Sequence, residues 1–481
     1  MKLSELLKGI ETKISFDCEV NNVVVDSRLV QKGDLFVCLS GENFDGHNYI
    51  EEAKKRGASA IVGERGEVIK VKNSRKALAK IAANYFSNPR KHFRLIGITG
   101  TNGKTTTSFI VKNILECAGK KVGLIGTLGS FIGERHIESN LTTPDPMELQ
   151  KLFSIMAKEE VDFVVMEVSA HALALHKLWN ITFDVGILTN VTQDHLDFFK
   201  TMENYKKTKL SFIEEYVKIG IVSSDDLVGQ EVILRAQNEK NFTKIYSFGL
   251  ANPADNFATK IHYSNLGTSY FLNIGDNLFC VNTMLCGEFN VMNALAASCA
   301  CFYLGIDINA IKDGLNTMKP VLGRFNTINL SNGASVVIDY AHTPDGLKKI
   351  LENVRLICKG RVFCLFGCGG NRDKTKRPIM GGIASNLADC VVLTSDNPRF
   401  ENPEEIIQDI RLGIKKDNYV CITDRILAIK YSMEQLEKND VLVLAGKGAE
   451  DYIEQNGKKT SYNEYETVEN LSKNLKEEAE L

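Results

Sequence analysis

The sequence GTNGKTT at residues 100–106 constrains the fold of this chain more than any other segment. It follows an apolar run at residues 95–98 and precedes a segment of helical periodicity that ends at Gly119. A glycine-rich turn between a strand and a helix directs backbone N–H groups, a lysine and a hydroxyl to one place, where they can hold nucleotide phosphates. The segment therefore predicts an α/β sheet that binds ATP, with Lys104 on the terminal phosphates and Thr105 as a Mg²⁺ ligand.

The match to the general phosphate-loop pattern is partial. That pattern has a glycine at the position of Ile98, whereas this chain has Gly97 one residue earlier. The alternative interpretation of the segment is a tight turn between a strand and a helix.

Length and composition indicate an ordinary globular protein. The chain has 481 residues, which favours about three domains. Its net charge of -2 gives no basic excess for nucleic acid, and no run of 18 apolar residues suggests membrane insertion. Twelve cysteines lie singly in apolar stretches, and residues 1–10 lack an apolar leader. We expect a cytoplasmic protein with reduced cysteines, small-molecule substrates and a monomeric state.

Short β-rich runs alternate with helical patterns from residue 94 onward, which predicts a parallel sheet. The runs span residues 95–99, 121–125, 162–168, 184–189 and 219–222. Residues 244–285 read instead as antiparallel hairpins, with turns at 265–267 and 275–276, and a helix resumes near Asn290.

A second alternating series follows Gly323, with strands expected at residues 336–340, 361–366, 390–394, 419–423 and 441–445. A smaller mixed segment precedes residue 94, with strands at 23–25, 35–39 and 60–62 and a linker at 87–90. We therefore predict an α/β protein of three domains. They are a small mixed α/β domain at 1–92, a central phosphate-loop domain with a parallel sheet at 93–322, and a Rossmann-like domain at 323–481.

Several further segments resemble one family over essentially the whole chain. They are MEVS at 166–169, TNVTQDHLD at 189–197, GEFNVMN at 287–293 and DYAHTP at 339–344. Together with residues 99–106 they resemble the Mur ligases, ATP-dependent amide-forming enzymes of bacterial cell-wall precursor synthesis.

Three other segments narrow the resemblance. DSR at 26–28 with GDLF at 33–36 is similar to a uridine-diphosphate-binding first domain, and TTP at 142–144 to a muramoyl-peptide loop. GGNRD at 369–373 with DNPR at 396–399 is similar to an amino-acid site. The resemblance implies a peptidoglycan-synthesis enzyme that adds meso-2,6-diaminopimelate to the D-glutamate side-chain carboxylate of UDP-N-acetylmuramoyl-L-alanyl-D-glutamate, through an acyl phosphate.

The resemblance also implies roles for individual residues. Catalysis is assigned to Lys104, to His195 and to Lys209, the last as a carbamate formed with CO₂. The implied Mg²⁺ ligands are Thr105, Glu167, His195 and the carbamate of Lys209. The implied ATP contacts are Gly100, Thr101, Asn102, Gly103, Lys104, Thr105, Thr106, Asn290, Asn293, Arg324 and Asp339. Without the resemblance, Lys209 reads as part of a solvated helix face, and Asn290 and Asn293 as capping residues.

The implied contacts to the UDP-muramoyl peptide are Val25, Ser27, Thr142, Thr143, Ser169 and Lys177. Five positions depart from the family pattern, and the first is Ala170, which stands where serine is common. Leu175 and Lys177 stand where glutamine and arginine are common, Asn326 where glutamate is common, and Ala449 where histidine is common. Leu175 cannot hydrogen bond, so we expect it outside the site.

The implied amino-acid contacts are Arg372, Asp396, Asn397, Pro398, Arg399, Gly446 and Glu450. Diaminopimelate differs from lysine by a second carboxylate, which a planar guanidinium can hold in a bidentate pair. Arg399 therefore favours diaminopimelate over lysine, and Glu450 is expected to anchor an amino group.

Three alternatives stay open from the sequence. The first is the lysine-adding ligase of the same family, which would differ around Arg399. The second is a folate polyglutamate ligase, which lacks a uridine-binding first domain. The third is a phosphate-loop switch protein whose nucleotide state controls a partner.

Overall fold

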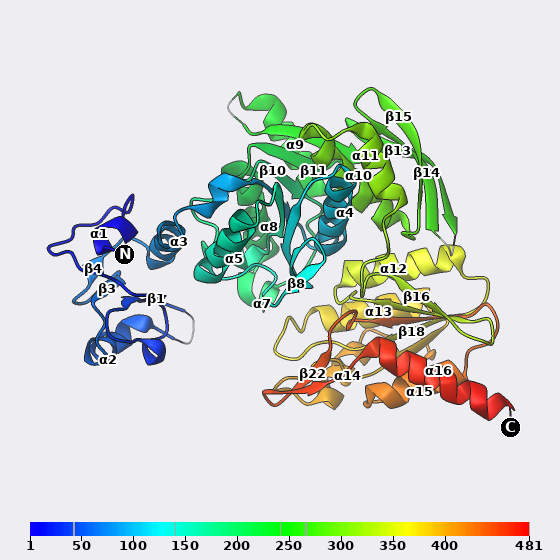
Figure 1. Cartoon of the computed structure of the whole chain (residues 1–481). Helices are drawn as coiled ribbons and strands as arrows, with labels where there is room; N and C mark the ends of the chain where they lie inside the picture. Colours follow the sequence, from blue (N-terminus) through cyan, green and yellow to red (C-terminus); the bar gives the residue numbers. More distant parts are fainter. Residues whose placement is uncertain (42–43, 140, 241, 265–266, 481) are drawn as a thin grey trace.

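Three β-sheets, each with helices packed against it, succeed one another along the chain in the computed structural model (Figure 1). The structure describes residues 1–41, 44–139, 141–240, 242–264 and 267–480. The small first sheet lies at one end of the molecule, and the last sheet lies beside the central one (Figure 1). The predicted α/β class with three successive units is confirmed.

The first sheet contains four parallel strands in the order β1-β2-β3-β4. They are β1 (Val23–Val24), β2 (Leu35–Val37), β3 (Ala60–Gly63) and β4 (Ile69–Lys70). The helices of this unit are α1 (Leu3–Leu6), α2 (Ile50–Lys55) and α3 (Ser74–Tyr85), with single 3₁₀ turns at Ser27–Leu29, Gly46–Tyr49 and Pro89–His92. Every residue of β2 is buried, as expected for a central parallel strand. Strand β4, which has a buried isoleucine and an exposed lysine, was not predicted.

The linker expected at residues 87–90 is a sharp turn between the first two units. Ser87 and Asn88 both have positive φ angles, at 59° and 54°, and a 3₁₀ turn follows. Arg90 then donates to the carbonyl oxygen of Thr182 and to Asp184, so the turn is attached to the central unit.

The central sheet has eleven strands in the order β15-β14-β13-β12-β11-β10-β5-β9-β6-β7-β8. Its strands are β5 (Arg94–Thr99), β6 (Val122–Gly126), β7 (Gly129–Ile132), β8 (Arg135–Ile137), β9 (Phe163–Glu167), β10 (Val185–Leu188), β11 (Ile219–Ser223), β12 (Lys244–Gly249), β13 (Asn256–Ser264), β14 (Gly267–Ile274) and β15 (Asn277–Thr283). Strands β13 to β15 form the predicted antiparallel edge. The prediction was wrong for β12, which pairs in parallel with β11 and β13 and continues the parallel part of the sheet. Residues 265–266 of the first predicted turn lie outside the described residues. The short edge strands β7 and β8 were not predicted.

Helices cover both faces of the central sheet and form two separate cores. They are α4 (Lys104–Cys117), α5 (Pro146–Lys158), α6 (Ala170–Ala174), α7 (Leu196–Phe199), α8 (Met202–Ser211), a π-helical turn (Phe212–Tyr216), α9 (Leu227–Asn238), α10 (Glu288–Tyr303) and α11 (Ile308–Asn316). Helix α4 packs against α10 and α11 on one face, which fixes the position of the phosphate loop at its N-terminus.

The last sheet has the order β16-β17-β21-β18-β19-β20, parallel except for the edge strand β16. Its strands are β16 (Asn326–Asn329), β17 (Ser335–Asp339), β18 (Val362–Phe366), β19 (Cys390–Leu393), β20 (Tyr419–Cys421) and β21 (Val441–Ala445). Its helices are α12 (Pro344–Ile357), α13 (Lys376–Leu387), α14 (Pro403–Arg411), α15 (Arg425–Glu434) and α16 (Glu464–Glu480). A separate hairpin joins β22 (Tyr452–Gln455) to β23 (Lys458–Ser461), and neither strand was predicted.

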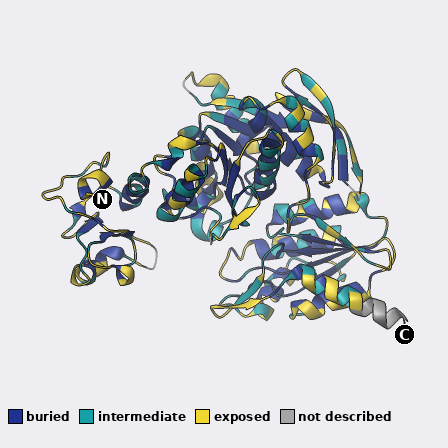
Figure 2. Ribbon diagram, viewed as in Figure 1, coloured by how far each residue is buried: buried dark blue, intermediate teal, exposed yellow. Residues whose placement is uncertain are grey.

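The buried residues lie mainly in the strands of the sheets and on the helix faces that cover them. Figure 2 shows the inner strands of the two larger sheets buried, whereas the helices expose their outer sides. All twelve cysteines are free thiols, as predicted, but Cys117 and Cys421 are exposed, so the expectation that all of them are core residues is wrong for these two. None of the helices in the described part of the chain combines the length and the apolar character needed to cross a membrane.

Candidate active site

The predicted phosphate loop lies between β5 and α4, as the sequence indicates. Gly100 and Gly103 have positive φ angles of 148° and 87°, which side chains rarely allow. A Cβ atom on Gly100 would lie 1.9 Å from the Thr189 hydroxyl, and one on Gly103 would lie 2.4 Å from the Asn293 side-chain oxygen. Both glycines are therefore required for two reasons: the backbone has a positive φ angle at each position, and neighbouring side chains leave no space for a Cβ atom.

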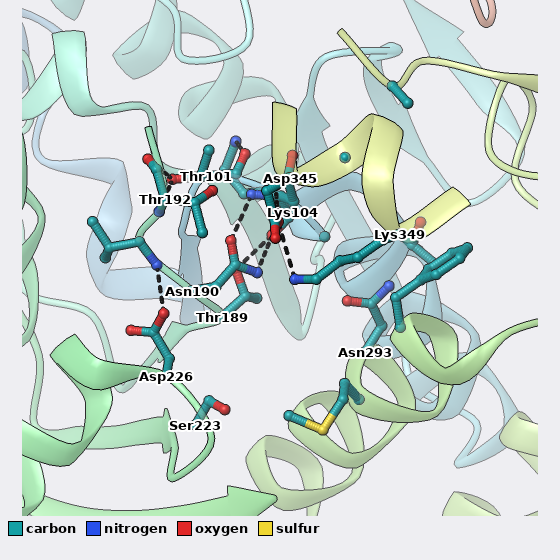
Figure 3. Close-up of a pocket in the computed structure, with 18 of the residues that line it drawn as sticks. Thr101, Lys104, Thr189, Asn190, Thr192, Ser223, Asp226, Asn293, Asp345 and Lys349 are labelled. Atoms are coloured by element: carbon teal, nitrogen blue, oxygen red, sulfur yellow. Dashed lines mark hydrogen bonds and ion pairs between the residues drawn. The ribbon is translucent and has the colours of Figure 1, made fainter. Parts of the chain in front are cut away.

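The segment after β10 holds this loop in place (Figure 3). The Thr189 hydroxyl donates to the Asn102 carbonyl oxygen at 2.6 Å, and the Asn102 N–H donates to the Asn190 side chain at 3.0 Å. The Thr101 hydroxyl donates to the Thr192 carbonyl oxygen and lies 3.1 Å from the Tyr205 hydroxyl. The TNVT segment thus acts as a support for the phosphate loop.

A cavity of about 830 Å³ opens in front of the loop and is lined by both the central and the C-terminal unit. Among the predicted ATP contacts, the lining residues are Thr101, Asn102, Gly103, Lys104, Thr105, Thr106, Asn293, Arg324 and Asp339. Gly100 and Asn290 do not line it. Asn290 lies behind Asn293, which donates to its side-chain oxygen at 3.1 Å.

Among the described residues, three hydrogen bonds connect the C-terminal unit directly to the phosphate loop, and the longest runs from the Thr343 hydroxyl to Asn102 Oδ1 at 3.4 Å. Arg324 Nη2 donates to Thr105 Oγ1 at 3.1 Å, and Asn102 Nδ2 donates to Asp345 Oδ2 at 2.8 Å. Asp345 lies in the first turn of α12, the helix that faces the central unit in Figure 1, and it also pairs with Lys349 at 3.0 Å. The two units therefore meet at the loop itself.

Asp339 orients the backbone around Arg324. Its carboxylate accepts hydrogen bonds from the N–H groups of Phe325 and Ala341, at 2.8 and 2.7 Å. Burial raises the pKa of Asp339, although Arg324 opposes the shift.

Glu167, at the end of β9, is a fully buried carboxylate beside the loop. It accepts hydrogen bonds from the Thr105 hydroxyl at 3.1 Å and from the N–H and the hydroxyl of Thr127, each at 2.9 Å. The Thr105 and Glu167 oxygens are hard donors of the kind that Mg²⁺ prefers. No group of three or more His, Cys, Asp or Glu side chains suited to a metal ion occurs among the described residues.

Lys209, in α8, is almost completely buried behind the loop. Its Nζ donates to the Gly100 carbonyl oxygen at 2.8 Å. Burial, followed by the positive charge of Lys104, lowers the pKa of Lys209 well below its ordinary value. This position therefore favours a neutral amine, which is unusual for a lysine in a Lys-Lys-Thr-Lys segment.

His195 lies at the start of α7 with a left-handed backbone, at φ 55°. Its Nε2 lies 3.3 Å from Asp194 Oδ2, and its ring contacts the edge of the His171 ring at 4.7 Å between centroids. Burial lowers the pKa of His195, although Asp194 opposes the shift. A neutral imidazole of this kind can act as a metal ligand.

The predicted muramoyl-peptide contacts fall into two separate places. Thr142 and Ser169 line the cavity, and Thr143 lies directly behind it, donating to the Glu167 carbonyl oxygen at 2.8 Å. Lys177 pairs with Asp145 at 2.8 Å. Leu175 ends α6 and does not line the cavity, as expected.

Val25 and Ser27 belong to the first unit and do not line this cavity. Val25 is exposed, whereas Ser27 is buried and donates to the Glu52 carboxylate at 3.3 Å. The chain therefore places these two predicted contacts apart from the phosphate loop.

The predicted amino-acid contacts form a second cluster, on the C-terminal unit and outside the cavity. Asn397 Nδ2 donates to Glu450 Oε2 at 2.8 Å, and the buried Lys447 lies between them, 2.7 Å from Asn397 and 3.2 Å from Glu450. Gly446 has a φ angle of 114°, and a Cβ atom there would lie 2.7 Å from Asp396.

The two arginines of this cluster lie on adjacent loops. Arg372 is half exposed and lies 4.0 Å from Asp197 of the central unit. Arg399 is mostly buried, donates to the Gly370 carbonyl oxygen at 2.9 Å and pairs with Glu454 at 3.3 Å. Pro398 connects Asn397 to Arg399, and its carbonyl group lies against Gly370.

Two departures from the family pattern have local explanations. The Asn326 side-chain oxygen accepts hydrogen bonds from the Gly323 N–H at 2.6 Å and from the Tyr465 hydroxyl. The small side chain at Ala449 lies close against Gly323, where a Cβ atom would be 3.0 Å away.

Several residues at the site were not predicted. They are Thr127, Asp345, Lys349, Lys447 and Glu454. Asp345 directly follows the DYAHTP segment, and Lys447 lies between Gly446 and Glu450, so adjacency to a motif is the signal that could have identified them. Thr127 and Glu454 have no such signal.

Three family models match successive parts of this chain, one in each of the three units. Residues 19–87 match the model described as "Mur ligase family, catalytic domain", residues 98–301 match "Mur ligase middle domain", and residues 323–448 match "Mur ligase, glutamate ligase domain". A relative from Clostridium acetobutylicum is 45% identical over 99% of this chain and 100% of its own length. This chain belongs to the Mur ligase family.

Its relatives in the family carry specific names. The Clostridium acetobutylicum protein is named UDP-N-acetylmuramoyl-L-alanyl-D-glutamate--2,6-diaminopimelate ligase 1. A Clostridium botulinum protein is named UDP-N-acetylmuramoyl-L-alanyl-D-glutamate--2,6-diaminopimelate ligase. It is 43% identical to this chain, over 99% of this chain and 100% of its own length.

Solved structures of Mur ligases share the architecture. A structure of UDP-N-acetylmuramoyl-L-alanyl-D-glutamate--2,6-diaminopimelate ligase has a TM-score of 0.70 and 30% identity, covering 99% of each chain. A Thermotoga maritima MurF ligase in complex with ADP has a TM-score of 0.61 and 24% identity, covering 89% of this chain and 94% of its own. The second likeness concerns the fold alone.

Proposed function

We propose that this Mur ligase uses ATP to add meso-2,6-diaminopimelate to the D-glutamate side-chain carboxylate of UDP-N-acetylmuramoyl-L-alanyl-D-glutamate. The names of relatives up to 45% identical over full length support this substrate pair. The observation that carries the proposal within the structure is the contact of Arg324 with Thr105, because it brings the amino-acid-binding unit onto the phosphate loop. In such a site the two substrates can approach one γ-phosphate.

The chemistry requires activation of a carboxylate before an amine can attack it. In our proposal the D-glutamate carboxylate accepts the γ-phosphoryl group, and the amine of the diamino acid then displaces phosphate, which leaves ADP and a new amide. Lys104 and Arg324 line the cavity from opposite units and offset the repulsion between substrate carboxylate and triphosphate. Lys104 currently donates to the carbonyl oxygens of Gly100 and Thr101, at 3.0 and 2.9 Å, so it must turn outward to reach phosphate.

We propose that Mg²⁺ is held by Thr105 and Glu167, with His195 and a carbamate on Lys209 serving a second ion. The hydroxyl and carboxylate oxygens, 3.1 Å apart and buried, suit a hard cation. When bound, Mg²⁺ supplies charge neutralisation to the triphosphate. Lys104, Thr105 and Thr106 would then hold the phosphates from the protein side.

The remaining residues divide between two substrates. We propose that Val25, Ser27, Thr142, Thr143, Ser169 and Lys177 contact the UDP-muramoyl peptide. Arg372, Asp396, Asn397, Pro398, Arg399, Gly446 and Glu450 are proposed to contact the diamino acid. We propose domain boundaries after residues 92 and 322, and each family-model match falls within one proposed domain, which supports this division. All these groups come from one chain, so we propose an active monomer, working in the cytoplasm where ATP is available.

The decisive test supplies ATP, Mg²⁺ and UDP-N-acetylmuramoyl-L-alanyl-D-glutamate with one diamino acid at a time. We expect phosphate release with meso-diaminopimelate to be at least about a hundredfold more efficient than with L-lysine, because lysine lacks the second carboxylate that the Arg399 guanidinium can hold. Higher efficiency with lysine would assign the chain to lysine addition. Phosphate release without any amino acid would contradict a ligase.

A further inference from the structure

The segment at residues 317–325 connects the last helix of the central unit to β16 of the C-terminal unit, and Arg324 lies within it. The backbone on both sides of Arg324 is left-handed, because Gly323 and Phe325 have positive φ angles of 72° and 51°. This conformation is unfavourable for a phenylalanine, so contacts from the rest of the fold must maintain it. The direction in which Arg324 leaves the backbone therefore depends on those contacts.

Tyr465, in the first turn of the C-terminal helix α16, provides one of these contacts. The Gly323 N–H donates to the Tyr465 hydroxyl oxygen at 2.7 Å and to Asn326 Oδ1 at 2.6 Å. The Tyr465 hydroxyl in turn donates to the same Asn326 oxygen, which also accepts from the Arg324 N–H at 3.3 Å. Burial raises the pKa of Tyr465 to about 12, so the hydroxyl keeps the proton that it donates. Two side chains thus hold the N–H groups of two successive residues.

The start of α16 is itself firmly attached to the C-terminal unit. Glu464, the residue before Tyr465, pairs with Arg425 at 2.7 Å, and both side chains are almost completely buried. Val468, about one turn further along the helix, is completely buried in the core on one face of the last sheet. A shift of Tyr465 would disturb this buried ion pair, which is costly. The Tyr465 hydroxyl is therefore a fixed point from which the 317–325 segment is held.

The Arg324 side chain extends from this segment to the phosphate loop. Its guanidinium lies over the Tyr340 ring, 4.5 Å from the ring centroid, and donates to Thr105 Oγ1 at 3.1 Å. Both of these partners are uncharged, so neither holds the guanidinium as strongly as a bidentate carboxylate would. The charge of Arg324 thus stays available for phosphate, and the position of its backbone largely decides where the guanidinium reaches.

We propose that Tyr465 and Asn326 position Arg324 for phosphoryl transfer, so that the C-terminal helix contributes to catalysis without touching a substrate. This inference rests on the proposed function of Arg324 at the triphosphate, and it does not depend on which amino acid is added. Without the Tyr465 hydroxyl, the Gly323 N–H loses one acceptor and Asn326 loses one donor. Arg324 then takes up directions that miss the phosphate, and a displacement of about 1 Å is enough to weaken an interaction made in the transition state.

The test is a double-mutant cycle on the full-length enzyme, with ATP, UDP-N-acetylmuramoyl-L-alanyl-D-glutamate and the amino acid that the wild type uses. For Tyr465→Phe we expect kcat to fall at least about fivefold, whereas KM for the amino acid stays within about twofold. In an Arg324→Ala background the same substitution should change kcat by less than about twofold, because the residue through which it acts is absent. Asn326→Ala should give the same pattern.

Tyr462→Phe is the matched control. The Tyr462 hydroxyl is also buried, but it donates to Glu464 at 3.0 Å, so its loss should leave kcat unchanged.

Two results would overturn the inference. One is a wild-type kcat in Tyr465→Phe, and the other is a loss of kcat that is equally large with and without Arg324, since the hydroxyl would then act through another group or through stability. The midpoint of thermal unfolding shows whether each variant is folded, and the same criteria apply to Asn326→Ala if Tyr465→Phe does not fold. A wild-type enzyme that forms no amide would overturn the proposed function and this inference with it, whereas use of lysine would leave the inference intact.

Discussion

Lys104 and Lys209 donate to the same carbonyl oxygen, that of Gly100, at 3.0 and 2.8 Å. Two ammonium groups at one carbonyl oxygen repel each other, and both lysines are shifted toward the neutral form, in each case first by burial. The phosphate loop thus has one lysine, Lys104, that lines the cavity and a second, Lys209, that is buried behind the loop. This arrangement explains how one of two lysines can react as an amine while the other stays available for phosphate.

Lys209 is expected to form a carbamate with CO₂ at a pH where ordinary lysines do not. Its lowered pKa means that a larger fraction is neutral at a given pH, whereas an ordinary lysine is neutral in roughly one molecule in a thousand near pH 7.4. After labelling with ¹³C-bicarbonate, we expect a carbamate resonance near neutral pH that weakens as the pH falls. Lys209→Ala should remove the resonance and lower activity by roughly tenfold to a hundredfold, with partial recovery in short carboxylic acids.

The exposed Lys207, two residues away, is the matched control for Lys209. Lys207→Ala should keep both the resonance and the activity, because its side chain faces solvent. A fully active Lys209→Ala enzyme would exclude a functional carbamate.

Gly103→Ala is expected to weaken ATP binding at least about tenfold, because the new Cβ would lie 2.4 Å from the Asn293 side-chain oxygen and displace it. Gly119→Ala is the control, since Gly119 also has a positive φ, of 71°, but has open space around it. Both variants should lose about 1 kcal/mol of unfolding free energy from backbone strain. Isothermal titration with a non-hydrolysable ATP analogue distinguishes them, and equal affinity in the two variants would contradict a role for Asn293 at the nucleotide.

Arg324→Ala is expected to lower kcat/KM for ATP by roughly a hundredfold, as for other groups that stabilise a transferred phosphoryl group. The contact of Arg324 with Thr105 crosses between two units, so the loss should also separate them in solution. Steady-state kinetics measures the first effect and small-angle scattering the second. Arg324→Lys should keep part of the rate, because it restores the charge without the planar fork. Wild-type kinetics in Arg324→Ala would show that the contact has no part in catalysis.

A buried ion pair should make stability depend on Glu401. Arg377 is 1% exposed and binds both carboxylate oxygens of Glu401, at 3.0 and 3.1 Å. Glu401 also accepts a hydrogen bond from the Asn371 N–H of the GGNRD loop. A backbone bond joins this loop to the DNPR loop, because the Gly370 N–H donates to the Asn397 carbonyl oxygen at 2.9 Å. Arg377 also pairs with Asp409 at 2.8 Å, so Glu401→Gln leaves the guanidinium one carboxylate partner, and we expect a loss of about 2 kcal/mol.

The pH dependence of this effect has a defined sign. Hydrogen bonds from Arg377 lower the pKa of Glu401 from 4.5 to about 2. The stabilisation is therefore complete above pH 4.5 and is lost as the pH falls toward 2. In urea unfolding, the difference in unfolding free energy between wild type and Glu401→Gln should be constant well above pH 4.5 and should shrink as the pH falls from about 4.5 toward 2. Glu405→Gln, at an exposed position of α14, should show no such dependence, and a pH-independent difference for Glu401→Gln would contradict the ion pair.

The amino-acid sequence by itself determined the phosphate loop, the alternation of strands and helices, and the family. These features are local, because a strand, a glycine turn and a helix start lie within about twenty residues of one another, and each has its own period or turn chemistry. The short edge strands β7, β8, β22 and β23 escaped prediction, since partly polar segments of three or four residues adopt strand structure only when a neighbour supplies hydrogen bonds.

Only the tertiary structure decided which charges neutralise one another. The sequence places Lys447 three residues from Glu450 but does not show that the lysine is completely buried between Glu450 and Asn397. It likewise leaves Glu454 as an unremarkable hairpin residue, whereas the fold brings it to Arg399, 55 residues away. Electrostatic interactions depend on distance in space and on burial, and neither is encoded in local sequence patterns.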